Sequence, residues 1–300
     1  MKNSNTHFNS INSLSFSQRM ADISALFKFR LTMLVVFSSV MAYFIGAESF
    51  NPIAVILLVL GGSFVTFAAN ALNQVLEKDY DKLMKRTENR PIPQGRMTSS
   101  TAVMLAGFLS LIGIGLLCLA NVWAGLLGTA SLILYAFIYT PFKRISSISV
   151  LIGAIPGALP MSIGCIVAEG TITPLAIALF AIQFFWQFPH FWAIAFLSHE
   201  DYSKAGYKMM PSKSGLPDAE IGFQSFIYSL FLYPVYGALF ALGYQSLLGT
   251  ILMTVLSIAY SFYAWQLYKK VDVTSAKKLM FSSFAYLPIA LFILFIFKLT

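Results

Sequence analysis

Three polar residues with oxygen-bearing side chains recur at four-residue intervals near the end of a long apolar segment. They are Asn73, Glu77 and Asp81, and on a helix they share one face with Asn70, whereas Asp79 points elsewhere. Magnesium takes oxygen ligands, usually one or two protein carboxylates, with water and substrate phosphate oxygens completing its octahedron. The spacing therefore predicts a helix face that can hold a metal-bound diphosphate.

Basic residues follow this segment closely. Arg86, Arg90 and Arg96 lie in the next polar loop, where guanidinium groups could form forked contacts with phosphate oxygens. Pro91 and Pro93 would stop any helix there and give the loop a fixed shape. The plain alternative is a solvated loop with balanced charges. Carboxylates at the C-terminal end of a helix, however, oppose its macrodipole by about 0.3–1 kcal/mol each, which favours a compensating cation.

A second unusual run ends another apolar segment. It reads Trp186-Gln-Phe-Pro-His-Phe-Trp192, and the acidic pair Glu200 and Asp201 follows it. A lone histidine in a membrane helix is more often hydrogen-bonded structure than a ligand, yet ionisable residues within a membrane commonly have a function. We therefore treat His190 as a candidate ligand-binding residue, and Trp186 as an aromatic face that could stabilise a carbocation.

The composition indicates how these segments are placed. Hydrophobic residues make up 58% of the chain and charged residues 11%, with a mean hydropathy of +0.74, whereas soluble proteins contain about 25% charged residues. Nine apolar segments are long enough to cross a hydrocarbon core, which takes about 20 residues. Because they are continuously apolar, we predict an all-α polytopic membrane protein with nine transmembrane helices in one bundle. The predicted spans are residues 24–46, 52–76, 101–119, 121–140, 150–168, 174–197, 221–243, 246–267 and 280–298.

The positive charges predict the orientation. The chain has 20 Lys and Arg residues, and all except Lys298 lie in the N-terminal tail, at the start of the first span, or in alternate loops. This bias places the N-terminus and the charged loops in the cytoplasm and, with nine spans, the C-terminus outside. Residues 1–22 are polar and predict a disordered cytoplasmic tail before a membrane domain of residues 23–300. The net charge of +8 is then topological, and we expect no nucleic-acid partner.

Four motifs together resemble a known family. The first is Asn73-x3-Glu77-x3-Asp81-x4-Arg86-Thr87-x2-Arg90-Pro91. The others are Tyr139-Thr140-x2-Lys143-Arg144, then Gly153-x2-Pro156-Gly157-Ala158-x-Pro160, and the tryptophan-rich run continuing to Asp201-Tyr202-x2-Ala205-Gly206-x2-Met209-Met210-Pro211. This set resembles the UbiA superfamily of intramembrane prenyltransferases, in particular the branch that farnesylates heme. The resemblance covers about residues 24–298.

The resemblance implies a membrane cavity in which farnesyl diphosphate and heme b are joined, with water addition, to give heme O. By position, Asn73, Glu77 and Asp81 would hold one Mg²⁺, and Glu200 and Asp201 would supply a second acidic metal site. The product could be handed over to a heme A synthase, and the membrane would be the bacterial cytoplasmic (inner) membrane. The residues expected to contact the two substrates are Arg86, Arg90, Lys143, Arg144, Asn70, His190, Tyr139 and Trp186.

Other functions remain open alternatives. One is an aromatic polyprenyltransferase of a quinone pathway, although the tryptophan-rich run and the lack of an aspartate near His190 argue against it. A second is a transporter, but transporters usually bind substrate near the membrane midplane through interrupted helices, whereas these carboxylates gather at the rim. A heme-handling protein without catalysis would leave the acidic residues and arginines without a purpose.

Overall fold

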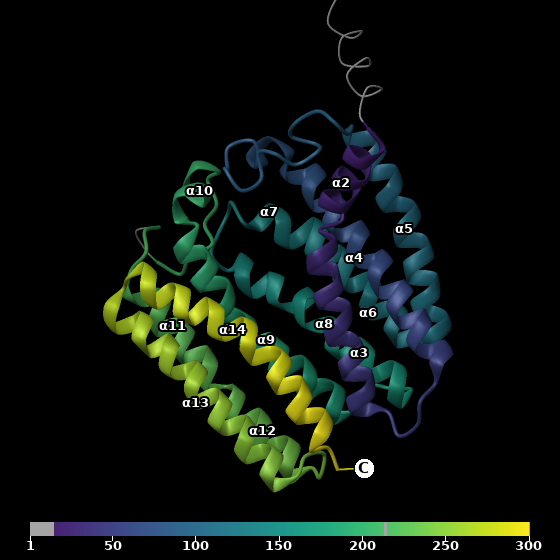
Figure 1. The fold of residues 1–300 in the computed structure, drawn as a ribbon, viewed down its shortest axis with the longest axis vertical. Coiled ribbons are helices and arrows are strands. Elements are labelled where there is room, and N and C mark those ends of the chain that lie inside the picture. The colour runs from purple at the N-terminus through teal and green to yellow at the C-terminus, as the bar shows by residue number, and fades with distance from the viewer. Residues whose placement is uncertain (1–14, 213–214, 300) are drawn as a thin grey trace, which may run out of the picture.

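The computed structural model describes residues 15–212 and 215–299, which form a bundle of long helices (Figure 1). In this described part, nine helical segments are long and apolar enough to cross a membrane, which confirms the predicted all-α fold. The elements are α2 (Phe16–Leu26), α3 (Phe29–Gly46), α4 (Pro52–Asp81), α5 (Ser99–Ala120), α6 (Val122–Ile133), η1 (Leu134–Tyr139), α7 (Thr140–Phe142), α8 (Ser149–Glu169), α9 (Pro174–Leu197), α10 (His199–Lys204), α11 (Ala219–Leu230), α12 (Leu232–Ala241), α13 (Leu247–Lys270) and α14 (Val273–Ile296).

Two of the spans change helix type or direction along their length. The fourth consists of α6, the π-helical segment η1 and the short α7 in one run, and the seventh consists of α11 and α12, which meet at Phe231. A π-helical turn widens the helix by one residue and is frequent at functional sites. Here η1 comes just before Thr140 and Lys143, and it therefore sets the direction in which that end of the span presents its side chains.

The N-terminal region differs from our expectation. Residues 16–22, expected in a disordered tail, belong to α2, while residues 1–14 of that tail lie outside the described residues. The first span begins at Phe29 and not at 24, because Lys28 adopts a left-handed conformation (φ 46°) that ends one helix and starts the next. Asp22 of α2 is buried and accepts bonds of 3.0 and 2.9 Å from Nε and Nη2 of Arg96. This pair ties α2 to the loop after α4.

The last span also begins earlier than predicted. Asp272 accepts a hydrogen bond from the Ser275 N–H and so caps α14, which starts at Val273, seven residues before the expected position. Two lysines, Lys277 and Lys278, occupy exposed positions in its first turns, which the hydropathy pattern assigned to a loop. Long charged side chains tolerate such positions because their stems can lie along apolar surface while the ammonium stays in water.

Close contacts in the middle of α3 and at its C-terminal end complete the bundle. Gly164 of α8 lies so near this helix that a Cβ atom there would fall 1.8 Å from the carbonyl oxygen of Ser39. At the C-terminal end of α3, Lys298 Nζ donates to the carbonyl oxygens of Phe44 and Ala47 at 2.9 and 2.7 Å. This lysine, the exception in the charge pattern, thus caps free helix carbonyls, where a cation is favoured.

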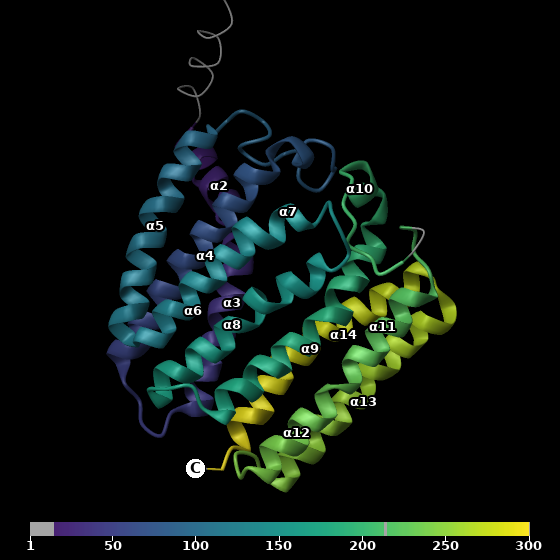
Figure 2. The same ribbon diagram turned by 180° about the vertical axis from the view of Figure 1, so that it is seen from behind.

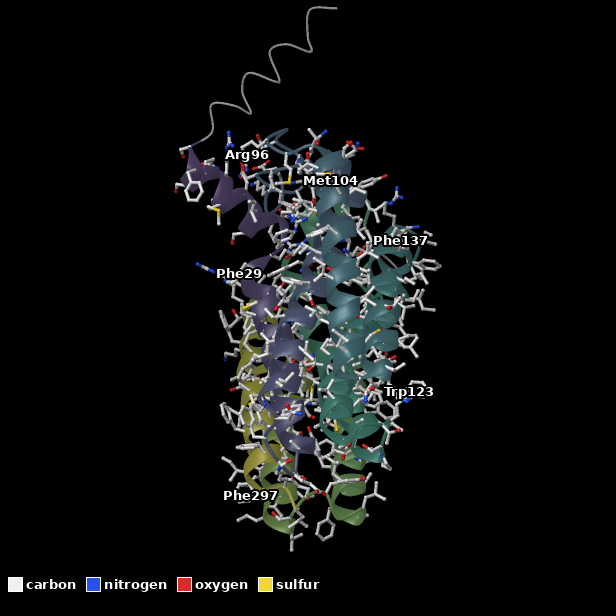
Figure 3. All side chains as sticks on the ribbon, turned by 90° about the vertical axis from the view of Figure 1, so that its right-hand side faces the viewer. Phe29, Arg96, Met104, Trp123, Phe137 and Phe297 are labelled. Carbon is white, nitrogen blue, oxygen red and sulfur yellow. The ribbon has the colours of Figure 1, made fainter. Side chains whose placement is uncertain are left out.

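The polar loops gather at one end of the bundle. Figures 1 and 2 show α2, α10 and the loop between α4 and α5 at the upper end, with the C-terminus at the lower end. In the side view, Arg96 lies at the upper end among many nitrogen and oxygen atoms, and Phe297 lies at the opposite end (Figure 3). In the middle of the molecule, α9 packs against α8 on one side and α11 and α14 on the other.

Candidate active site

One face of α4 carries the predicted polar side chains into the molecule. Asn73, Glu77 and Asp81 are 1%, 5% and 0% exposed, and we call these three residues the α4 row. The helix continues to Asp81, five residues beyond its predicted end, and so keeps the row on one regular helix. Asp79 instead lies at the surface, where it pairs with Lys82, which is also exposed, at 3.4 Å. The structure thus separates the acidic residues as the spacing predicts.

Both carboxylates of the row are paired with cations from other segments. Lys143 Nζ, which follows α7, lies 2.7 Å from Glu77 Oε1, and Arg90 Nη1 lies 2.7 Å from Asp81 Oδ2. Burial pulls the pKa of Lys143 down, but the Glu77 carboxylate more than offsets this, and the net pKa is raised above the usual lysine value. The lysine is therefore held as a buried cation.

The second oxygen of Asp81 is available for a ligand. Asp81 Oδ1 is buried and has no hydrogen-bond partner among the described residues. An unpaired buried carboxylate oxygen is costly, so such an atom in a native site indicates an ion or a ligand group that completes it. Together with Glu77 and Asn73 it gives two carboxylates and one amide oxygen, which suits Mg²⁺ because this ion keeps water and phosphate oxygens as its other ligands.

Lys28 completes the site and is the main residue that our sequence analysis did not assign. Its Nζ donates to Asn73 Oδ1 at 2.9 Å. Asn70 and Gln74 hold the preceding backbone: the Asn70 amide donates to the Phe27 carbonyl, and the Gln74 amide donates to the carbonyls of residues 25 and 26. Burial, followed by the positive charges nearby, lowers the pKa of Lys28 to about 7. Asn70, which we expected to contact a substrate, thus holds this backbone through a hydrogen bond in the structure.

The segment around η1 supports the row from the opposite side. Thr140 Oγ1 accepts a hydrogen bond of 3.0 Å from Asn73 Nδ2, and Lys143 Nζ lies 4.5 Å from the centre of the Tyr139 ring. A Cβ atom at Gly153 of α8 would come within 2.7 Å of that ring. The glycine in the third motif therefore makes room for Tyr139, which in turn lies against the cation that pairs with Glu77.

Helix α10 and the loop after it meet the loop after α4 at this site. The Arg86 N–H donates to Asp201 Oδ2 at 3.4 Å, and the Arg86 guanidinium lies 5.9 Å from the Tyr202 ring centre. The N–H of Lys208 donates to the carbonyl oxygen of Lys143 at 2.7 Å. The two acidic helix ends therefore lie on the same side of the molecule, within one network.

Tyr207 belongs to the same group, although no spacing argument selected it. Its ring lies between those of Tyr80 and Tyr202, with centres 6.2 and 6.0 Å away. Burial, followed by the neighbouring Glu77 and Asp81 carboxylates, raises the pKa of its hydroxyl. Aromatic faces that surround buried cations can also stabilise a carbocation, provided that water is kept out.

Three predicted residues lie away from this group or make other contacts. Glu200 is exposed on α10 and has no contact with the α4 row in the described residues. Arg144 lies over the Tyr80 ring at 4.4 Å and bonds to its hydroxyl. Arg96 is bound to Asp22 and thus holds α2 in place. In the described part of the chain, no three acidic, histidine or cysteine side chains are close enough to hold a metal ion.

His190 and Trp186 face α14. His190 Nδ1 lies 2.7 Å from Ser283 Oγ, and the Trp186 indole donates to the Ser283 carbonyl oxygen at 3.0 Å. Their rings stack on each other at 5.0 Å, and Phe284 covers the histidine from α14. His190 lies two turns from the end of α9, which is about 10 Å below the acidic loop at about 1.5 Å per residue. Its side chain is buried there, with 9% of its surface exposed.

Comparison with known proteins gives the family. The family model described as the UbiA prenyltransferase family matches residues 34–293. The chain therefore belongs to the UbiA prenyltransferase family. It is also 39% identical over 275 residues to a protein of Christiangramia forsetii named protoheme IX farnesyltransferase, covering 90% of this chain and 91% of that protein. A protein of the same name from Cytophaga hutchinsonii is 40% identical over 264 residues, which cover 87% of this chain and 92% of that protein.

Solved structures show the same fold at low sequence identity. A digeranylgeranylglyceryl phosphate synthase matches with a TM-score of 0.78 at 16% identity, over 92% of this chain and 97% of that chain. A UbiA homologue of Archaeoglobus fulgidus bound to dimethylallyl diphosphate (DMAPP) and Mg²⁺ matches with a TM-score of 0.69 at 14% identity, over 89% of this chain and 99% of that chain. The chain therefore shares the overall fold of these two structures.

Proposed function

We propose that the protein transfers the farnesyl group of farnesyl diphosphate to a vinyl group of heme b, with addition of water, and releases heme O and diphosphate. The observation that carries this proposal is the α4 row, where two buried carboxylates and an amide face three cations beside the loop of Asp201. The named relatives at about 40% identity over most of both chains supply the choice of acceptor.

The residues of the α4 row would hold Mg²⁺, with Asp201 in reach of the same ligand through the Arg86 loop. Bound there, the metal ion would neutralise charge that develops on the departing diphosphate. Lys143 and Arg90 would contact phosphate oxygens, and a cation in a water-poor site stabilises such charge far more than one in water. The second acidic residue, Glu200, remains a predicted ligand that would require α10 to move.

The reaction can be written so that its atoms balance. The allylic C–O bond of farnesyl diphosphate breaks, and diphosphate leaves with the bonding pair. The terminal vinyl carbon of heme b forms a C–C bond with farnesyl C1, which leaves a cation on the carbon beside the porphyrin. Water adds there and loses a proton, giving the hydroxyethyl group. Tyr139 and Tyr207, beside Lys143, offer aromatic faces to the farnesyl cation and exclude stray water.

We further propose that heme b lies against α9 and α14, where His190 contacts either its iron or a propionate. The stacked Trp186 ring and Phe284 give this place an apolar, aromatic lining. The protein would lie in the bacterial cytoplasmic membrane with the acidic loops on the cytoplasmic side, because the Lys and Arg residues gather at that end. Heme O could then pass to a heme A synthase.

A direct assay tests the proposed function. Purified protein in nanodiscs is incubated with farnesyl diphosphate, heme b and Mg²⁺, and heme O is sought by mass spectrometry. In parallel, 4-hydroxybenzoate replaces heme b, because a quinone-pathway enzyme would prenylate it. Prenylated hydroxybenzoate without heme O would refute the choice of acceptor. A His190→Ala protein that binds heme b with unchanged affinity and absorption spectrum would refute the role of His190.

A further inference from the structure

Three oxygens of the α4 row, one on each residue, already accept hydrogen bonds from cations of the chain. Lys28, Lys143 and Arg90 each donate to one of its side chains, at 2.9, 2.7 and 2.7 Å. The three cations come from separate segments: one precedes α3, one follows α7 and one lies in the loop after α4. Asn73 Oδ1 and Glu77 Oε1 are oxygens that a metal ion would need, and Arg90 binds the Asp81 carboxylate whose other oxygen, Oδ1, has no partner in the described residues. A metal ion therefore competes with the cations of the chain itself.

We propose that Lys28, Lys143 and Arg90 are exchange cations, which pair with the α4 row before substrate arrives and move onto the diphosphate when a divalent metal takes their place. Metal and diphosphate then bind with strong positive coupling, and neither binds well alone. This inference rests on the proposed metal–diphosphate chemistry of the site. It adds the order of events and assigns a role to Lys28.

The charge balance of the site supports this coupling. With all groups ionised, two carboxylates and three cations leave one net positive charge in a buried volume. A divalent metal ion alone would raise that positive charge further, and a diphosphate alone would leave an excess of negative charge. Uncompensated charge is costly to bury, whereas the two ligands together cancel most of it. The charge of the site is thus best balanced when the metal ion and the diphosphate bind together.

The geometry offers a path for the exchange. Asp81 Oδ1 is buried without a partner in the described residues, so a metal ion that binds this atom displaces no cation from it. Lys143 has a second place for its charge, because its Nζ already lies 4.5 Å from the Tyr139 ring and 5.8 Å from the Tyr207 ring. Such cation–π contacts reduce the cost of leaving Glu77.

A binding experiment without heme or an isoprenyl chain tests the exchange. The full chain in nanodiscs is titrated with Mg²⁺ in a calorimeter, with and without inorganic pyrophosphate, and free concentrations are corrected for the complex that the two form in solution. Pyrophosphate should tighten Mg²⁺ binding roughly 10- to 100-fold, and Mg²⁺ should tighten pyrophosphate binding by the same factor. Coupling below about threefold would overturn the proposal.

Variants separate exchange from simple electrostatic attraction. Lys143→Met should bind Mg²⁺ alone about fivefold or more tightly than wild type, because a competing charge is removed, while its coupling to pyrophosphate falls. Lys143→Arg should restore the coupling, and Lys28→Met should change Mg²⁺ binding in the same direction if Lys143→Met does not fold. Lys82→Met, which alters only the surface pair with Asp79, is the matched control.

The results also distinguish this inference from the proposed function. Weaker binding of Mg²⁺ alone to Lys143→Met, with an unchanged melting temperature, would show that the lysine does not compete for the metal site. Strong coupling in a protein that makes no heme O would leave the exchange standing and reject the heme reaction. Heme O formation without coupling between Mg²⁺ and pyrophosphate would support the heme reaction and reject the exchange.

Discussion

Replacement of Asp81 by asparagine should stop the reaction and leave the protein folded. The change keeps the shape of the side chain and an oxygen for Arg90, but it removes one unit of negative charge from the α4 row. At about 4 Å and an effective dielectric constant of about 20, one such charge is worth about 4 kcal/mol to a neighbouring cation. If the transition state feels that loss in full, the rate falls about a thousandfold, since about 1.36 kcal/mol corresponds to a factor of ten.

The assay is heme O formation at saturating Mg²⁺, with thermal unfolding measured on the same preparation. Asp79→Asn is the matched control, because Asp79 lies two residues away on the same helix but is solvent-exposed, and it should keep wild-type activity. Loss of the charged bond to Arg90 should cost about 1–3 kcal/mol of stability. Asp81→Asn activity within tenfold of wild type in a folded protein, or equal losses in both variants, would contradict the assignment of Asp81 to the metal.

Three further outcomes are expected. Removing divalent ions with a chelator should abolish heme O formation, and Mg²⁺ should restore it, whereas activity that persists at full rate in excess chelator would exclude a metal-dependent step. Asp201→Asn should lower the rate far more than Glu200→Gln, because Asp201 contacts the Arg86 loop and Glu200 is exposed; equal rates in a side-by-side assay would contradict this. Gly153→Ala should displace the Tyr139 ring and reduce stability by about 1–3 kcal/mol, which a lower melting temperature would show. An unchanged melting temperature and an unchanged rate would contradict this close contact.

Much of the fold could be predicted from the sequence because lipid imposes a simple rule. Every backbone polar group in the membrane must be satisfied within its own helix, so long apolar segments mark helices. The errors fall where that rule does not apply. Hydropathy assigned the start of α14 to a loop because Lys277 and Lys278 are charged, and it missed α2, which is held by the pair of Asp22 and Arg96. Such tertiary contacts leave no periodic signal.

The site could be predicted only where its residues share one element. The four-residue spacing placed Asn73, Glu77 and Asp81 on one helix face, and the structure confirms that face. The sequence could not tell which cation pairs with which residue of the α4 row. Lys28 and Lys143 are far from α4 in sequence and reach it only through folding. A lysine at the polar edge of the first span, where a long stem can extend into the bundle, was the available signal for Lys28.

The continuity of α8 bears on the rival transporter function. Transporters of the inverted-repeat kind bind substrate near the midplane, where unwound backbone offers free carbonyls. Here α8 passes through Pro156 and Pro160 without a break. Pro160 has no N–H to donate to the Pro156 carbonyl, and this carbonyl accepts a hydrogen bond from Ser131 Oγ at 3.2 Å. The Ala154 carbonyl accepts one from the Gln187 amide at 2.6 Å. Side chains of neighbouring helices thus donate hydrogen bonds to the backbone carbonyls of α8 at this depth, so these carbonyls are not free for a substrate. The acidic and basic groups that can bind a charged substrate lie instead at the rim.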